Sequence, residues 1–318
     1  SKAAAGAVAE RVLYRALSRG LSFKTTMGNV LTLTPPLIVT PARLTTADAL
    51  GDRQRWGLAI QLYSTRSEQS WGVGDLGDLA RICEIAGTGY GADFVQINPL
   101  HAAEPAPPVE DSPYLPTTRR FVNPLYIRVA DIAEADRLPK KARKKLSKVA
   151  AEFAPINTSP RKLKRNKSFR CKLLWLNKIY DAGRSAEREA DFTAFREREG
   201  EGLIRFATWC ALAEHYGPRT DDWPDRLGKP KKLARAIAKR ADRIDFHCWL
   251  QWICDQQLAA AGTAATDSGM AIGVIADLAV GTHHRQAARI DPKRAAPWPQ
   301  TALPGDTIWM GVIDGEGR

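Results

Sequence analysis

The sequence predicts an α/β protein built on a parallel sheet. Three short, nearly continuous apolar runs occupy residues 56–64, 92–101 and 270–280, each with a polar residue near its C-terminal end. Such runs are typical of strands that are buried on both faces of a parallel sheet. Amphipathic helical patterns precede the second run, at residues 75–90, and the third run, at residues 245–265. The order strand, helix, strand predicts βαβ units.

A long helical segment separates the second predicted strand from the third. About 170 residues lie between them, and most of these show helical spacing of apolar residues. The predicted helices cover residues 141–153, 169–182, 187–199, 203–215 and 232–241. We therefore expect a large helical insertion after strand 2, over residues 103–244.

The first 50 residues carry weaker patterns. Residues 1–28 have weak helical spacing, and residues 30–44 combine β-branched residues with prolines, which is typical of an edge strand. The chain begins with Ser1 rather than methionine, so we expect a processed form or a segment of something longer.

Composition argues against several classes of protein. Apolar residues make up 44% of the chain and charged residues 26%, as in soluble globular proteins rather than disordered or fibrous ones. No apolar run approaches the roughly 18 residues that a membrane span needs. Glu10 and Arg11 interrupt the short N-terminal apolar stretch, which argues against a secretory signal. We therefore expect a cytoplasmic protein without a membrane partner.

The five cysteines are scattered and form no Cys-x-x-Cys pair. An odd, dispersed set predicts reduced thiols rather than a disulfide framework, and it argues against a zinc site. The five histidines also lack metal-ligand spacing. We expect neither a metal ion nor a cofactor.

The positive charge is concentrated in one segment. The net charge is +12, and residues 137–172 contain 14 Lys and Arg against a single acid, Glu152. A patch that binds nucleic acid or another polyanion would explain this density. A solvated helical surface explains it more simply, because aromatic residues do not interleave with the cations and the segment has no nucleic-acid-binding motif. We expect this basic insert to be peripheral and to bind no nucleic acid.

The glycines at 72, 74 and 77 fit the G-x-G-x-x-G pattern of dinucleotide-binding proteins. The context differs, because a polar loop separates these glycines from the first strand and no acid ends the second strand. We predict a tight loop in which Asp75 caps a helix.

Two residues near predicted strand ends are candidates for function. Residues 110–116 read Glu-Asp-Ser-Pro-Tyr-Leu-Pro and follow the second strand, where α/β folds place their sites. An exposed Tyr114 can stack on the C–H face of a sugar, although a loop merely stiffened by proline is an equal alternative. Asp277 ends the third strand and is the best single acidic candidate.

Six blocks in order resemble the N-terminal half of the 4-α-glucanotransferases, also called amylomaltases, of glycoside hydrolase family 77. The blocks are residues 56–67, 71–79, 91–102, 112–127, 245–258 and 269–281. The form resembled is the long actinobacterial one, which has an extra domain before the barrel.

This resemblance implies the first three strands of a (β/α)₈ TIM barrel. It implies a retaining enzyme that transfers α-1,4-glucan segments to another glucan or to glucose through a covalent intermediate. α-1,4-Glucans and maltooligosaccharides would be its partners. Tyr114 matches the tyrosine of the sugar subsite beside the scissile bond, and Asp277 matches the aspartate that helps hold the catalytic groups. Ser112 and Asn98 match residues of the same cleft.

The family's catalytic carboxylates have no counterpart in the sequence. The nucleophile lies in an Arg-x-Asp-His motif and the acid/base in a Glu-Asp-Leu-Gly motif, and neither motif occurs. Both are expected downstream, so we name no catalytic residue and expect a truncated chain that is inactive alone. The alternative is a non-catalytic glucan-binding or interaction fragment.

These observations predict five segments. They are the end of an N-terminal extension (1–50), barrel strands 1 and 2 (51–102), the helical insert subdomain (103–244), a barrel helix with strand 3 (245–281) and a divergent tail (282–318).

Overall fold

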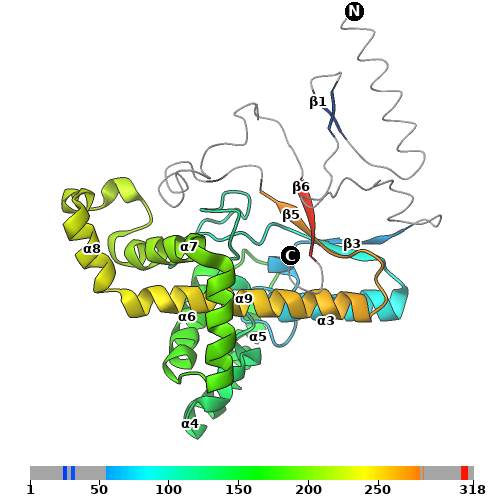
Figure 1. Ribbon diagram of the computed structural model, residues 1–318. Helices are drawn as coiled ribbons and strands as arrows, with labels where there is room; N and C mark the ends of the chain where they lie inside the picture. The colour runs from blue at the N-terminus through cyan, green and yellow to red at the C-terminus, as the bar shows by residue number, and fades with distance from the viewer. Residues whose placement is uncertain (1–23, 27–29, 33–54, 280–281, 283–308, 314–318) are drawn as a thin grey trace, which may run out of the picture.

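The parallel sheet is the centre of the fold. The computed structural model describes residues 24–26, 30–32, 55–279, 282 and 309–313 (Figure 1). Strands β3 (Gly57–Ile60), β4 (Phe94–Ile97) and β5 (Gly273–Leu278) are adjacent and parallel, with Gly57 opposite Phe94 and Phe94 opposite Gly273. The three predicted strands are confirmed in this order, and each is shorter than its apolar run.

A fourth strand extends the sheet in the opposite direction. β6 (Trp309–Ile313) pairs antiparallel with β5, placing Met310 opposite Asp277. The sequence analysis predicted no strand in this tail. A short hairpin, β1 (Lys24–Thr26) and β2 (Val30–Thr32), lies apart from this sheet. Strand β2 confirms the first three residues of the strand expected over 30–44. Strand β1 shows that the weak helical pattern expected over 1–28 is wrong at residues 24–26. Residues 1–23 and 33–44 lie outside the described part.

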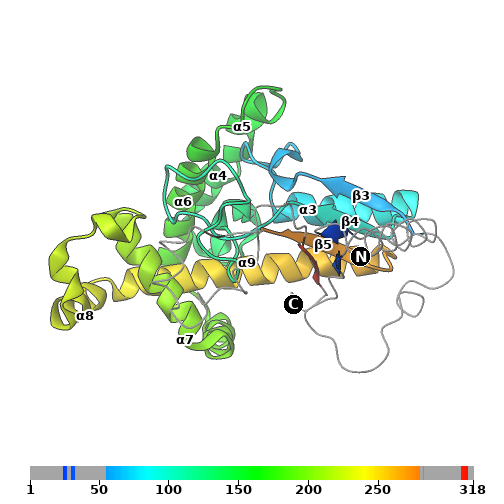
Figure 2. The same ribbon diagram turned by 90° about the horizontal axis from the view of Figure 1, so that it is seen from above.

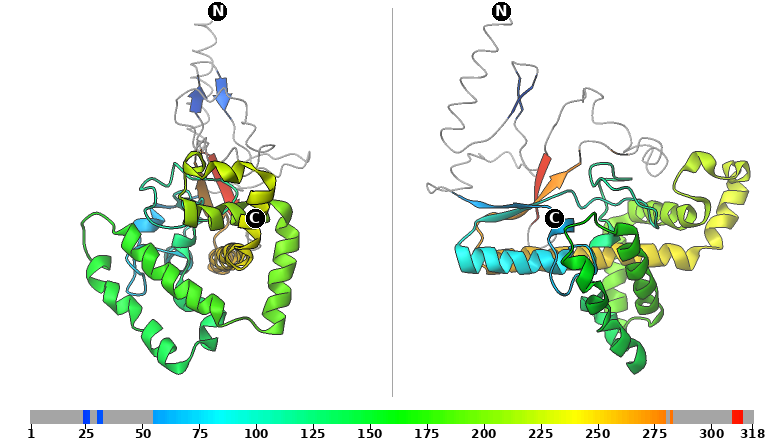
Figure 3. Two further views of the ribbon diagram at one scale, coloured as in Figure 1. Left: turned by 90° about the vertical axis from the view of Figure 1, so that its left-hand side faces the viewer. Right: turned by 180° about the vertical axis from the view of Figure 1, so that it is seen from behind.

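Two helices cover one face of the sheet. α3 (Leu76–Glu84), extended by a π-helical turn at Ile85–Gly89, lies beside α9 (Ala241–Asp267) beneath the strands (Figures 1 and 3). Small residues of both elements, Ala86, Ala261 and Ala265, lie in the core that they share. A Cβ atom on Gly87 would lie 2.3 Å from the hydroxyl of Ser268, which ends α9. This layer positions the strand ends that form the candidate site.

Asp75 starts α3 as predicted. Its carboxylate accepts hydrogen bonds from the backbone N–H groups of Gly77 and Asp78, while the Asp78 carboxylate accepts from Asp75 N–H. This reciprocal cap satisfies donors that helix geometry leaves unpaired. The glycine cluster is therefore a tight loop before a helix, and the interpretation as a capped loop is confirmed.

The segment between β4 and β5 is helical. It contains α4 (Lys140–Leu146), α5 (Val149–Asn157), α6 (Arg165–Asp181), α7 (Ala186–Tyr216) and α8 (Pro230–Ala238). Short 3₁₀ turns lie at Pro124–Tyr126, Val129–Asp131, Ala133–Arg137, Thr220–Asp222 and Asp225–Gly228. Gly200, at φ +63°, interrupts α7 between the two helices expected at 187–199 and 203–215. The single helix expected at 141–153 is instead divided into α4 and α5.

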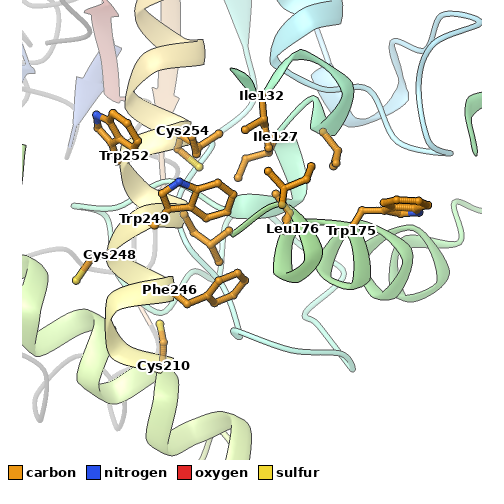
Figure 4. Packing of buried hydrophobic residues seen from close by; sticks show 14 of the residues in the cluster. Ile127, Ile132, Trp175, Leu176, Cys210, Phe246, Cys248, Trp249, Trp252 and Cys254 are labelled. Atoms are coloured by element: carbon orange, nitrogen blue, oxygen red, sulfur yellow. The ribbon is translucent and has the colours of Figure 1, made fainter. Parts of the chain in front are cut away.

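The long helix α9 joins two hydrophobic cores. Its 27 residues span about 40 Å at 1.5 Å per residue. Phe246, Trp249 and Trp252 pack in the first half against α6, α7 and the 3₁₀ turns (Figure 4). Ala261 and Ala265 in the second half belong to the core beneath the sheet. The helical segment and the sheet therefore share one continuous element.

The basic insert is not wholly a solvated surface. α4 is mostly exposed, but the side chain of Lys172 is fully buried. Its Nζ donates to the carbonyl oxygens of Leu125 (2.7 Å) and Ile127 (2.8 Å) and lies 3.5 Å from an Asp75 carboxylate oxygen. Arg128 completes this buried cluster, 2.7 Å from Asp75 and 2.6 Å from Asp78. The expectation of a peripheral insert is therefore wrong at this end, because the acids that balance the charge lie elsewhere in the sequence.

Two further expectations concern the state of the cysteines and the presence of membrane-spanning helices. All five cysteines are free thiols, and four of them are buried. None of the described helices is both long enough and apolar enough to cross a membrane.

Candidate functional site

Tyr114 and Asp277 meet at the carboxyl ends of the strands. The Tyr114 hydroxyl donates to Asp277 Oδ2 over 2.9 Å, across 163 positions of sequence. The two residues were predicted to lie at one end of the sheet, and this placement is confirmed. The Tyr114 side chain remains 46% exposed, so its ring is accessible to a ligand.

Burial and their mutual hydrogen bond set the protonation of this pair. Partial burial, followed by the hydrogen bond to Asp277, raises the pKa of Tyr114 to about 12. Burial also raises the pKa of Asp277, and the bond from Tyr114 opposes that rise. Asp277 Oδ1 is buried and has no hydrogen-bond partner among the described residues. The pair therefore places an aromatic face beside a carboxylate whose Oδ1 has no partner among the described residues.

The loop that carries Tyr114 is fixed by its own polar side chains. The Ser112 hydroxyl accepts from Tyr114 N–H (3.3 Å), and the Glu110 carboxylate accepts from Ser112 N–H (3.1 Å). Glu104 in turn accepts from Glu110 N–H (2.9 Å). Ser112 thus shapes the turn that presents the tyrosine.

Cations of the basic insert bind the same loop. Asp111 pairs with Lys162 at 2.6 Å and with Arg165 at 3.4 Å. The Arg165 guanidinium also lies 4.9 Å from the centre of the Tyr63 ring. Because the Arg165 side chain is only 14% exposed, the start of α6 forms part of the wall of the site.

Asn98 is committed to hydrogen bonds within the protein. Its Oδ1 accepts from Leu62 N–H (2.7 Å), and its Nδ2 donates to Pro99 O (2.9 Å) and to the Tyr126 hydroxyl (3.0 Å). The residue is buried and holds the chain after β3 against the chain after β4. This geometry favours a positioning role over direct contact with a ligand.

A small pocket lies behind the Tyr114 loop. Its lining includes Tyr63, His101, Ser112, Tyr126 and Arg165. Burial, with a smaller contribution from the charge of Arg119, lowers the pKa of His101 to about 4, so the imidazole is neutral at pH 7. The pocket therefore combines a neutral imidazole and two phenols with the paired charges of Asp111 and Arg165.

Several of these residues were not among the sequence candidates. Arg119 donates to Ala279 O (3.3 Å) and so joins the Tyr114 loop to the chain after β5. Tyr63 lies at the end of the first apolar run and just after β3, so the rule that sites gather at carboxyl ends of parallel strands could have identified it. Nothing in the basic run distinguishes Arg165 from its neighbours, and only the fold brings it to the site.

The structure gives no metal site in the region it covers. No group of three or more His, Cys, Asp or Glu residues with suitable geometry occurs among the described residues. His247 lies 3.3 Å from Glu214 inside the helical core, and His215 packs edge-on against Tyr216. His283 and His284 lie outside the described residues.

Comparison with known proteins identifies the family. Residues 60–288 match glycoside hydrolase family 77, described as 4-alpha-glucanotransferase. The chain belongs to this family. The 4-alpha-glucanotransferase of Mycobacterium tuberculosis is 47% identical over 257 residues, which cover 78% of this chain and 35% of that protein. The Haemophilus influenzae enzyme is 32% identical over 79% of this chain and 38% of its own length.

Solved structures agree with the α/β fold of this family 77 chain. Amylomaltase from Corynebacterium glutamicum aligns with a TM-score of 0.68 and 48% identity, covering 79% of this chain and 34% of that one. Amylomaltase from Streptococcus agalactiae, solved with acarbose, aligns with a TM-score of 0.61 at 18% identity, which supports the fold alone. The chain spans about a third of the length of these two curated relatives.

Proposed function

We propose that this chain forms one wall of the glucan-binding cleft of a 4-α-glucanotransferase. The observation that carries the proposal is the hydrogen bond between Tyr114 and Asp277 at the carboxyl ends of the strands. Family membership supplies the substrate class, because its described activity is glucan transfer. α-1,4-Glucans and maltooligosaccharides would be the ligands.

Each group of the pair has a chemical role in this proposal. The exposed ring of Tyr114 stacks on the apolar face of a glucose unit. Asp277 Oδ1, which is buried and unpartnered among the described residues, accepts a hydrogen bond from a sugar hydroxyl. Hydrogen bonds of this kind strengthen as positive charge develops on the sugar ring, so a carboxylate here stabilises the transition state. Ser112 and Asn98 hold the loop and the strand ends in place.

The family's architecture supplies the finer description. In this proposal, β3, β4 and β5 are the first three strands of a (β/α)₈ barrel, and residues 103–244 are a helical insertion after the second strand. Residues 1–50 end an N-terminal extension, 51–102 and 245–281 belong to the barrel, and 282–318 form a divergent tail. The antiparallel pairing of β6 fits none of the parallel barrel strands.

The proposal assigns no catalytic residue to this chain. Retaining transfer needs a nucleophilic carboxylate and an acid/base carboxyl about 5–5.5 Å apart. The motifs that carry them in the family are absent from the sequence. We therefore expect the 318-residue polypeptide to bind maltooligosaccharides without converting them. Clear disproportionation of maltotriose by the purified chain would contradict this.

The decisive test transfers this segment into a full-length relative. Residues 60–279 would replace the matching segment of the Mycobacterium tuberculosis enzyme, and disproportionation of maltotriose would be measured. The chimera should be active, and Asp277→Asn should lower its kcat/KM by about 100-fold or more, the effect of losing several kcal/mol of transition-state stabilisation. Tyr114→Ala should raise KM, whereas Tyr90→Ala, at another exposed tyrosine, should change neither constant.

The alternative is a glucan-binding fragment with no part in transfer. The absence of the catalytic motifs favours it. It predicts maltooligosaccharide binding by the isolated chain, but no effect of Asp277→Asn on the activity of the chimera. An active chimera that tolerates this substitution would therefore support the alternative over the transferase.

A further inference from the structure

A hollow lies between α7 and α8, at the end of the molecule away from the sheet. Figures 1 and 2 show α8 and β3 at opposite ends, joined by the length of α9. The hollow has a volume of about 990 Å³, the upper end of the range of roughly 300–1,000 Å³ for ligand sites. Its lining combines apolar residues of both helices with polar residues at the rim, and two tryptophans, Trp209 and Trp223, lie in its wall.

We propose that this hollow is a second binding site for α-1,4-glucan chains, separate from the Tyr114–Asp277 site. The choice of glucan as the ligand rests on the proposed function, whereas the site itself rests on the geometry of α7, α8 and the turns between them. Its substrate class would be a neutral oligosaccharide of several glucose units.

Trp223 supplies a rigid aromatic face. Its indole N–H donates to Gly217 O over 2.7 Å, and its ring packs at 6.1 Å against Tyr216. The ring is only partly buried and lines the hollow. A tryptophan that is already fixed loses little conformational entropy when a sugar ring stacks on it.

Trp209 supplies an unused donor. The residue is 4% exposed and lines the same hollow, and its buried indole N–H has no acceptor among the described residues. A buried donor without a partner carries a free-energy penalty, which a ligand oxygen would remove once the ring turns its N–H toward the hollow. Sugar hydroxyl and ring oxygens are acceptors of this kind.

The charges at the rim favour a neutral polyol over an anion. Three carboxylates, of Glu201, Asp221 and Asp225, line the hollow with one guanidinium, of Arg205. Arg205 pairs with Glu201 at 2.5 Å. The one guanidinium of the lining is thus already paired and leaves no free cation for a phosphate among the described residues there, while carboxylates readily accept hydrogen bonds from sugar hydroxyls.

Stacked rings connect the hollow with the chain that follows the Tyr114 loop. Trp209 stacks on Phe206 at 6.3 Å, and Phe206 stacks on Phe121 at 4.5 Å. The Phe121 carbonyl accepts from Ala102 N–H, in the segment that follows β4. Packed aromatic rings and one backbone hydrogen bond therefore connect the wall of the hollow with the segment after β4, near the candidate site.

The test measures maltoheptaose binding to the full 318-residue chain by titration calorimetry. In a Tyr114→Ala background, the binding that remains reports on the hollow. Adding Trp223→Ala should weaken it about tenfold. Adding Trp56→Ala instead should leave the remaining binding unchanged, because this 46% exposed tryptophan lies beside β3, at the other end of the molecule. Trp223→Phe, which keeps a ring face, should retain most of the affinity.

The outcomes separate the two proposals. If Tyr114→Ala alone abolishes binding, or if it weakens binding and Trp223→Ala leaves the remainder intact, the second site is overturned and the proposed function stands. If neither substitution weakens binding, both fall. If Tyr114→Ala has no effect and Trp223→Ala removes all binding, the second site stands and the Tyr114 site falls. If the unaltered chain binds no maltoheptaose, both fall. Should Trp223→Ala unfold the chain, as judged by circular dichroism, Trp209→Phe decides, because it keeps the ring, removes the N–H and should weaken binding about threefold.

Discussion

The two halves of α9 are packed by opposite means. The first half places large aromatic rings against the helical segment, where Tyr180 lies 5.3 Å from Phe246 and 5.7 Å from Trp249. The second half places alanines, Ala261 and Ala265, against α3 and the sheet. In one core α9 therefore contributes large side chains that fill volume, and in the other it contributes mainly small ones, which let it approach its neighbours closely. The difference predicts which substitution each region tolerates least.

The charges of the two regions also differ. Arg243 reaches Glu214 and Asn177 within the helical segment, and so links α9 with α7 and α6. Lys172 instead reaches from α6 to Asp75, the residue that caps α3, and so joins the helical segment to the layer beneath the sheet. The first network is internal to one region, while the second lies at the junction.

The largest effect is expected in the aromatic core. Trp249→Ala removes one of the largest fully buried side chains, and the cavity should lower the free energy of unfolding by about 4–5 kcal/mol. Urea unfolding followed by circular dichroism measures it. Trp56→Ala, at a half-exposed tryptophan, should cost less than about 1 kcal/mol. Equal losses in the two variants would contradict the volume-filling interpretation.

The next effect is expected at the junction. Lys172→Met leaves the Leu125 and Ile127 carbonyls without this donor, and Arg128 becomes the remaining cation beside Asp75. We therefore expect the free energy of unfolding to fall by about 3 kcal/mol. Lys164→Met, at an exposed lysine of the same basic insert, should change stability by less than about 0.5 kcal/mol. If both lysines behave alike, Lys172 does not join the regions.

The sequence predicted the sheet better than it predicted this junction. The strand positions follow from short apolar runs, and the Asp75 cap follows from local spacing. Lys172 lies within a run of cations whose local pattern is that of a solvated surface, and its partner Asp75 lies 97 residues away. Burial of one lysine among fourteen basic residues depends on a long-range contact, which local periodicity does not contain.

The candidate site divides in the same way. Tyr114 and Asp277 could be placed at one end of the sheet, because parallel strands point their carboxyl ends in one direction. The 2.9 Å bond between them, and the contact of Arg165 with Tyr63, depend on how the loop folds back. The antiparallel strand β6 was missed although its residues, Trp309–Ile313, form a short apolar run like the other strands, because the tail was treated only as a divergent segment.

The alanine-rich half should fail by overpacking. Ala261 is fully buried beneath the sheet, so Ala261→Leu forces α9 away from its neighbours and should cost about 2 kcal/mol. Ala259→Leu lies on a different face of the same helix, at a partly buried position, and should lower the free energy of unfolding by less. Thermal unfolding of both variants measures the difference. A harmless Ala261→Leu would show that the close approach is not what holds this layer.

His101 gives the sheet region a weak dependence on pH. Its folded-state pKa is lowered to about 4, against about 6.5 when unfolded, so the unfolded chain binds more protons between these values. The contribution is present above pH 6.5 and is lost as the pH falls toward 4. We expect the free energy of unfolding to fall by about 1 kcal/mol between pH 7 and pH 5.5, and we expect this fall to be absent in His101→Gln. An identical acid-side slope in His101→Gln would mean that the imidazole is not buried in its neutral form.

The smallest effect on stability is expected from Tyr114→Phe, which separates the two functions of the ring. The substitution removes the hydroxyl that donates to Asp277 but keeps the aromatic face, so the free energy of unfolding should change by about 1 kcal/mol or less. Because that hydrogen bond lowers the pKa of Asp277, its loss should raise that pKa further, which a ¹³C-detected titration of the carboxyl group measures. Binding of maltoheptaose should weaken about threefold in Tyr114→Phe and tenfold or more in Tyr114→Ala, if stacking contributes more than the hydroxyl. Equal losses in the two variants would assign the binding energy to the hydroxyl and its carboxylate partner instead of the ring.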